Sequence, residues 1–88
     1  MYKILFSKKA ANDFRKIGKS HLYPKTCKML DELQLNPFEP PYKKLNGKMY
    51  GIHLECYAKR INRMHRLVYK VDEKNKVIHV LSFWSHYE

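Results

Sequence analysis

The sequence has few of the features that by themselves identify a class of protein. It has two cysteines and three glycines in 88 residues, and no apolar run approaches the ~18 residues that a membrane-spanning helix needs. Cys27 and Cys56 are too few for a disulfide framework, and their spacing fits no zinc pattern. The apolar stretch around Leu5 is too short for a secretory signal. We therefore expect a single cytoplasmic domain over residues 1–88, with free thiols and no membrane segment.

Acidic side chains are also scarce, with 8 Asp and Glu against 18 Lys and Arg and a formal charge of +10. From residue 43 to residue 70 the only acid is Glu55, while the basic residues are Lys43, Lys44, Lys48, Lys59, Arg60, Arg63, Arg66 and Lys70. Such a segment attracts polyanions, because neutralising phosphates releases condensed counterions. Four tyrosines near it favour nucleic acid, since aromatic rings stack on exposed bases: Tyr42, Tyr50, Tyr57 and Tyr69. The alternative is a solvated surface that only aids solubility.

The first half of the chain predicts one strand and two helices. Alternating apolar residues at 2–6 indicate a short strand, and Ser7 then stands as an N-cap before a helix that Gly18 ends. A second helix begins near Tyr23 or Pro24 and ends at Asn36-Pro37. We expect the two helices to form a hairpin.

The second half predicts strands. They begin at about Leu45, continue through an alternating stretch at 52–61 and a second one at 66–71, and end with an apolar strand at 77–83 after a hairpin loop at 72–76. Strands joined by short connections pair antiparallel. The order β-α-α-β-β-β-β predicts an α+β fold, with two N-terminal helices on one face of a twisted, mainly antiparallel sheet.

The residues suited to chemistry are histidine, arginine and tyrosine. No two histidines have the helical spacing of a metal site, and carboxylates do not cluster, which argues against a metal-dependent nuclease. Near the end of the sequence, Trp84-Ser85-His86-Tyr87 precedes Glu88 and follows a strand apolar enough to be central. An imidazole exchanges protons near neutral pH, and arginine stabilises charge on a phosphate. Together they are suited to RNA cleavage in which the 2′-hydroxyl attacks its own phosphate.

Several sequence blocks resemble the Txe/YoeB toxins of the RelE/ParE superfamily over essentially the whole chain. The most specific are His65-Arg66-Leu67-Val68-Tyr69 and the terminal His86-Tyr87. Others precede them in the family's order: Asn36-Pro37-Phe38-Glu39, Pro40-Pro41-Tyr42, Lys44-Leu45, Gly47 and Gly51. The resemblance implies the microbial-RNase-like RelE/YoeB fold and a toxin that cleaves messenger RNA in the ribosomal A site. It also implies an acidic antitoxin of the YefM/Axe kind and no metal or organic cofactor, and it is compatible with a homodimer.

Carried over by position, the resemblance also assigns roles to residues. Arg66 stabilises charge on the scissile phosphate, His86 protonates the leaving 5′-oxygen, and Tyr87 places the nucleotide. Arg60 lines the basic groove, with Lys44, Lys48, Lys59 and Arg63 as further RNA-binding candidates. Trp84 is a candidate for stacking on a base, and His65 is expected to be structural.

The general base is where the chain departs from the family, which usually has a glutamate at the position of Lys43. An ordinary lysine is protonated at neutral pH, so Lys43 accepts a proton only if its neighbours lower its pKa, and otherwise it acts through its charge. A stretch between Gly51 and Tyr57 that is longer than in the family adds Glu55 as another candidate. Strict alternation puts Glu55 on the face opposite Arg60, so it reaches the site only through a bulge. A reaction without a dedicated base is the third alternative.

Two other functions stay open on sequence grounds. One is a homologue that binds the ribosome or RNA without cleaving, because its base is lost. The other is a gyrase inhibitor like the ParE branch of the superfamily, against which the terminal His86-Tyr87 argues.

Overall fold

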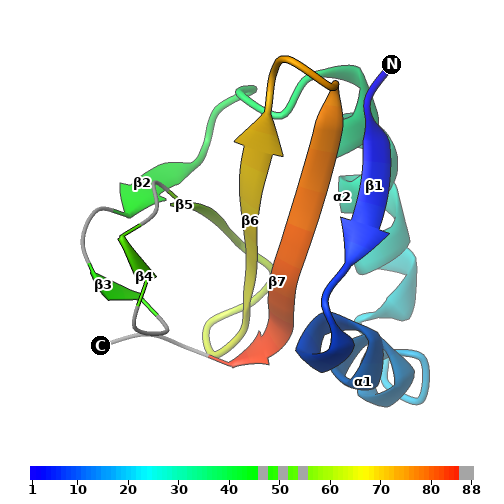
Figure 1. The fold of residues 1–88 in the computed structure, drawn as a ribbon. Helices are drawn as coiled ribbons and strands as arrows, with labels where there is room; N and C mark the ends of the chain where they lie inside the picture. Colours follow the sequence, from blue (N-terminus) through cyan, green and yellow to red (C-terminus); the bar gives the residue numbers. More distant parts are fainter. Residues whose placement is uncertain (46–47, 50–51, 54–55, 86–88) are drawn as a thin grey trace.

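A computed structural model describes residues 1–45, 48–49, 52–53 and 56–85 of the chain. Its elements follow in the order β1 (Lys3–Phe6), α1 (Lys8–Ile17), α2 (Tyr23–Leu35), β2 (Lys43–Leu45), β3 (Lys48–Met49), β4 (Ile52–His53), β5 (Cys56–Arg60), β6 (Arg66–Asp72) and β7 (Val77–Ser85) (Figure 1). Within the described residues, a five-stranded sheet has the order β1-β7-β6-β5-β2, in which β1 runs parallel to β7 and the other neighbours are antiparallel.

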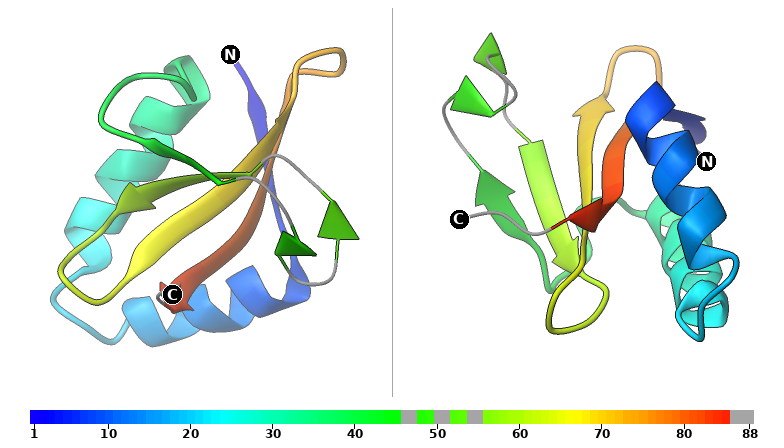
Figure 2. Two further views of the ribbon diagram at one scale, coloured as in Figure 1. Left: turned by 90° about the vertical axis from the view of Figure 1, so that its left-hand side faces the viewer. Right: turned by 90° about the horizontal axis from the view of Figure 1, so that it is seen from below.

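Both helices cover the same face of this sheet, while the small β3–β4 hairpin lies on the other side (Figure 2). This arrangement confirms the predicted α+β fold and its two N-terminal helices. Cys27 and Cys56 are both free thiols, as expected. No helix in the described residues is long and apolar enough to cross a membrane.

The ends of the helices have local causes. The Ser7 hydroxyl oxygen accepts a hydrogen bond of 3.0 Å from the Ala10 N–H, which satisfies one of the free donors at the start of α1. Pro24 stands in the first turn of α2, where a missing N–H costs nothing. Asn36 has extended backbone angles and ends α2 before Pro37.

The predicted strand at 52–61 is described in two parts, β4 and β5, with residues 54 and 55 outside the described residues. β4 pairs with β3, and β5 pairs with β2 and β6. The pairs Lys43–Ala58 and Lys48–His53 belong to one antiparallel register, so the described parts agree with the predicted strand. β2 begins at Lys43, earlier than the predicted Leu45, because it pairs with β5 from Lys43 opposite Ala58.

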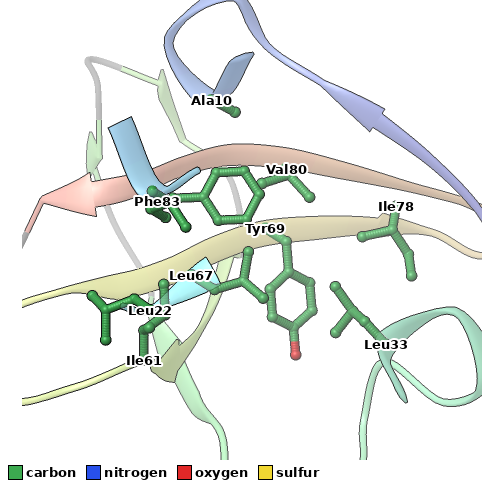
Figure 3. Close-up of a cluster of buried hydrophobic side chains, with 10 residues drawn as sticks. Ala10, Leu22, Leu33, Ile61, Leu67, Tyr69, Ile78, Val80 and Phe83 are labelled. Carbon is green, nitrogen blue, oxygen red and sulfur yellow. The ribbon is translucent and has the colours of Figure 1, made fainter. Parts of the chain in front are cut away.

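The main core lies between the sheet and the helices. Leu67, Tyr69 and Phe83 from the sheet meet Ile17 and Leu33 from the helices there, all with no exposed surface (Figure 3). The Tyr69 hydroxyl donates a 2.6 Å hydrogen bond to the Pro37 carbonyl, and burial raises the pKa of Tyr69. This burial contradicts the expectation that Tyr69 stacks on a base. Among the described residues, the opposite face carries a small cluster around Cys56, Ala58 and Val68.

A carboxylate from α1 completes the outer edge of β7. β1 pairs with β7 only from Val77 through Val80, so the later backbone groups of β7 have no strand on that side. The buried Asp13 accepts hydrogen bonds from the N–H groups of Phe83 (3.0 Å) and Trp84 (3.2 Å), and a third from Lys9 (2.9 Å). Burial by itself raises the pKa of Asp13, but these three bonds outweigh it and the pKa lies below its usual value. The ionised carboxylate thus takes the place of a neighbouring strand.

Replacing Asp13 with Asn should lower the free energy of unfolding by about 1–3 kcal/mol at pH 7, because hydrogen bonds to a charged acceptor are lost. A lowered pKa in the folded state stabilises the protein above the unfolded value of about 4, and this contribution disappears as pH falls through the folded pKa. Urea unfolding of both proteins between pH 7 and pH 2.5 should therefore show a difference that shrinks in acid. Asp31→Asn, at an exposed position of α2, is the control and should change little. An Asp13→Asn effect independent of pH would contradict this role.

Candidate nucleic-acid interface

Strand register gathers three cationic residues on the face of the sheet away from the helices. Arg66 pairs with Arg60 across β6 and β5, and Lys43 pairs with Ala58, two residues before Arg60. Side chains alternate along a strand, so all three share one face, and diagonal neighbours lie about 7–8 Å apart. Lys43 and Arg60 are exposed, and Arg66 is half-buried. The pairing therefore forms a compact positive site from residues that are far apart in the sequence.

The Arg66 guanidinium has an unmet donor. Its Nη1 atom is buried and has no hydrogen-bond partner within the described part of the chain. A buried donor left unpaired costs about 1–3 kcal/mol, and an anionic oxygen relieves that cost with a charge-assisted bond. This is the pattern expected of a side chain placed for a ligand rather than for the fold.

These three residues line one end of a groove with a volume of about 850 Å³, within the range of about 300–1,000 Å³ typical of ligand pockets. Ala58 also lines the groove, and its small side chain takes up little of the space. The other end passes the edge of β5 that β2 leaves open and reaches Met29, Glu32 and Tyr42 beside α2. Among the described lining residues the acids are Glu32 and Glu39, which the bases Lys25 and Lys59 can offset. Lys43, Arg60 and Arg66 add further positive charge, so an anion is favoured at the Arg66 end.

The remaining predicted RNA-binding residues are placed differently. Lys59 points to the helix side of β5 and donates a 2.6 Å hydrogen bond to the Glu39 carbonyl. Lys44 pairs with Tyr57 and so faces away from Lys43. Arg63 is exposed in the turn between β5 and β6, and Lys48 belongs to β3. The structure thus brings Arg60, Lys43 and Arg66 together on one face, while Lys44 and Lys59 belong to the other face. Lys59 nevertheless also lines the groove.

The aromatic candidates are largely occupied by other rings. Trp84 is half-buried and stacks on His65, with ring centroids 4.0 Å apart. Tyr57 packs between Tyr42 and Tyr69, at 5.7 Å from each. Among the tyrosines of the described residues near the groove, Tyr42 is exposed.

Glu55, His86 and Tyr87 lie outside the described residues, so their roles stay predictions. The last described residue before the terminal histidine is Ser85, whose backbone pairs with Arg66. No group of His, Cys, Asp and Glu able to hold a metal ion occurs among the described residues.

Sequence reasoning missed Asp13. Its position among Ala10 and Ile17 on the buried stripe of α1 was the available signal, because an acid on a core-facing stripe needs a partner. The partners are backbone N–H groups of β7, which only the tertiary structure brings to α1.

Comparison with known proteins identifies the class of protein to which this chain belongs, a class of toxins. A family model described as the ParE toxin of the type II toxin–antitoxin system parDE matches residues 4–88. The chain therefore belongs to the ParE toxin family, within the ParE/RelE superfamily, as the sequence blocks indicate. A comparison with curated proteins found no match.

Solved structures with the same fold include toxins of the YoeB and RelE types. A YoeB/ParE toxin from Agrobacterium tumefaciens has a TM-score of 0.82 at 21% identity, with 97% of this chain and 99% of that chain covered. A YoeB dimer from Staphylococcus aureus has a TM-score of 0.78 at 27% identity, with 98% of each chain covered. YoeB in a YoeB–YefM complex from the same organism has a TM-score of 0.75 at 28% identity, with 99% of each covered.

Lys43→Gln should weaken binding of a single-stranded 2′-O-methyl oligonucleotide and reduce its salt dependence. Each phosphate contact adds about 0.7 to the slope of log K against log salt concentration, so the slope should become shallower by about that amount. Fluorescence anisotropy at several salt concentrations measures it. Lys74→Gln is the control, because Lys74 is exposed in the β6–β7 loop at the far end of β6 from Arg66. Equal losses in both variants would mean that binding follows net charge alone.

Proposed function

We propose that this chain is the toxin of a toxin–antitoxin pair and that it cleaves messenger RNA in the ribosomal A site without a metal ion. The observation that carries the proposal is the half-buried Arg66, whose Nη1 donor has no partner among the described residues and which lines a groove with Lys43 and Arg60. A phosphodiester supplies the acceptor and the negative charge that this arrangement lacks.

The proposed reaction is an internal transfer. The 2′-oxygen attacks the adjacent phosphorus, a 2′,3′-cyclic phosphate forms, and the bond from phosphorus to the 5′-oxygen breaks. Arg66 stabilises the charge that builds on the non-bridging oxygens. His86 donates its proton to the leaving 5′-oxygen, and Tyr87 positions the nucleotide. The product strand therefore begins with a 5′-hydroxyl.

The proton of the 2′-hydroxyl has two candidate acceptors. Lys43 shares the groove with Arg66, which supports a role there, while Glu55 remains the carboxylate alternative. In a third scheme, without a dedicated base, Lys43 contributes charge alone.

The partners follow from charge and from the relatives. The formal charge of +10 favours both RNA and an acidic antitoxin. YoeB of Staphylococcus aureus has been solved with YefM and as a dimer. By analogy we propose that a YefM-like antitoxin neutralises this toxin, and that the ribosome and messenger RNA are its targets.

The match to the ParE family model favours one alternative, inhibition of gyrase. A catalytically impaired homologue that occupies the ribosome without cutting is the other. Neither needs a proton donor such as the His86 imidazole, and for that reason we prefer the nuclease.

Expression of the chain should arrest growth, and Arg66→Ala or His86→Gln should each restore growth while the folded protein still accumulates. Primer extension on a translated message should show discrete cuts with 5′-hydroxyl ends in the wild type and none in either variant. A stalled but uncut message would identify a binder. DNA damage signalling without RNA cleavage would identify a gyrase inhibitor, and full toxicity of both variants would refute the assignment.

A further inference from the structure

A stacked pair of aromatic rings belongs to the residues next to Arg66 and its partner Ser85, where β6 begins and β7 ends. Trp84 is the chain's single tryptophan, and its indole covers the His65 imidazole at a centroid distance of 4.0 Å and an interplanar angle of 17°. His65 immediately precedes Arg66, and Trp84 immediately precedes Ser85, the residue that pairs with Arg66. We propose that Trp84 and His65 are positioning residues that fix the direction of the Arg66 guanidinium. This inference rests on the proposed RNA cleavage.

The two strands beside Arg66 pair with it differently. On the β5 side the ladder is regular from Tyr69 to Arg66, which pairs with Arg60. On the β7 side the register shifts between Arg66 and Val68 and again between Val68 and Tyr69, and each shift leaves an extra residue on β7. Such bulges bend a strand and interrupt its hydrogen bonds. The end of β7 that pairs with Arg66 therefore lies beyond two irregularities, and on this side the stack supplies a constraint that the ladder does not.

Both rings of the stack are attached to a fixed backbone. The Trp84 N–H donates to Asp13 of α1 at 3.2 Å, and the Trp84 side chain packs against the main core. The His65 N–H donates to the Asn62 side-chain oxygen at 2.7 Å, and the His65 carbonyl accepts from the Ile61 N–H at 2.9 Å. Rigid contacts thus link α1 to β7, β7 to the indole, the indole to His65, and His65 to Arg66. Each ring limits how far the other strand end can shift.

This arrangement determines which kinetic constant the stack controls. A guanidinium displaced by about 1 Å stabilises the transition state poorly, at a cost of up to about 100-fold in rate. Substrate binding depends on many contacts between RNA, ribosome and toxin, so it changes far less. The stack should therefore govern the rate of cleavage in the bound complex rather than the affinity.

The test is single-turnover cleavage of a message on programmed ribosomes, with toxin concentration varied to separate the maximal rate from the half-saturating concentration. Trp84→Leu keeps apolar volume but removes stacking, and it should lower the maximal rate about 10- to 100-fold while the half-saturating concentration changes less than about threefold. Trp84→Phe restores a ring and should recover most of the rate. His65→Leu should match Trp84→Leu. Ile78→Val is the control, because Ile78 is buried near the opposite end of β7 and should lower only thermal stability.

The single tryptophan also reports the stack directly. An imidazole in contact with an indole quenches its fluorescence, so His65→Leu should raise the emission of the folded protein. Unchanged emission would mean that the stack does not form in solution, which would contradict the proposal.

Three kinetic outcomes separate this proposal from the proposed function. A raised half-saturating concentration at an unchanged maximal rate would show that Trp84 binds RNA instead of positioning Arg66. Wild-type rates in Trp84→Leu, with Arg66→Ala inactive, would remove the positioning role and leave the nuclease assignment intact. Wild-type cleavage by Arg66→Ala would overturn both.

Discussion

The carboxylate of Asp13 is the constraint on which the geometry of this molecule depends. β1 ends too early to cover all of β7, and without a substitute the N–H groups of Phe83 and Trp84 would be buried or half-buried donors with no acceptor. One ionised side chain on α1 satisfies both, and Lys9 balances its charge. The end of β7 is therefore held against α1, and the strand end that pairs with Arg66 is held with it.

The two sides of the sheet differ in packing and in how their polar groups are paired. The helix side of the sheet has a closed core, whereas the other side has small residues, exposed cations and a buried donor on Arg66 without a partner among the described residues. Leaving that donor unpaired sacrifices stability that a neutral, well-packed side chain would supply. We interpret this cost as the requirement for binding a phosphate, since the bond to the ligand recovers it. The cationic end of the groove thus lies on the face away from the main core, while the rest of the groove reaches α2.

Much of this arrangement was predictable from the sequence. The Ser7 cap, the Pro24 start of α2 and the alternating stretches are local signals, and the structure confirms the elements that they predict. The pairing partners of residues 52–61 were not predictable, because alternation along a strand does not show which strands lie beside it. Asp13 was missed because its partners are backbone groups about 70 residues away along the chain. In the site, charge counting found the cationic segment, but only register shows that Lys43, Arg60 and Arg66 share a face while Lys44 and Lys59 do not.

The central claim is that the Arg66 guanidinium receives the scissile phosphate. A structure of the toxin on a ribosome, with a message blocked by 2′-O-methylation at the cleavage site, tests it most directly. The account predicts a non-bridging phosphate oxygen within about 3 Å of a terminal guanidinium nitrogen, on the sheet face away from α1 and α2. A message that crosses the helix side, or that leaves Arg66 without a phosphate contact, would contradict it.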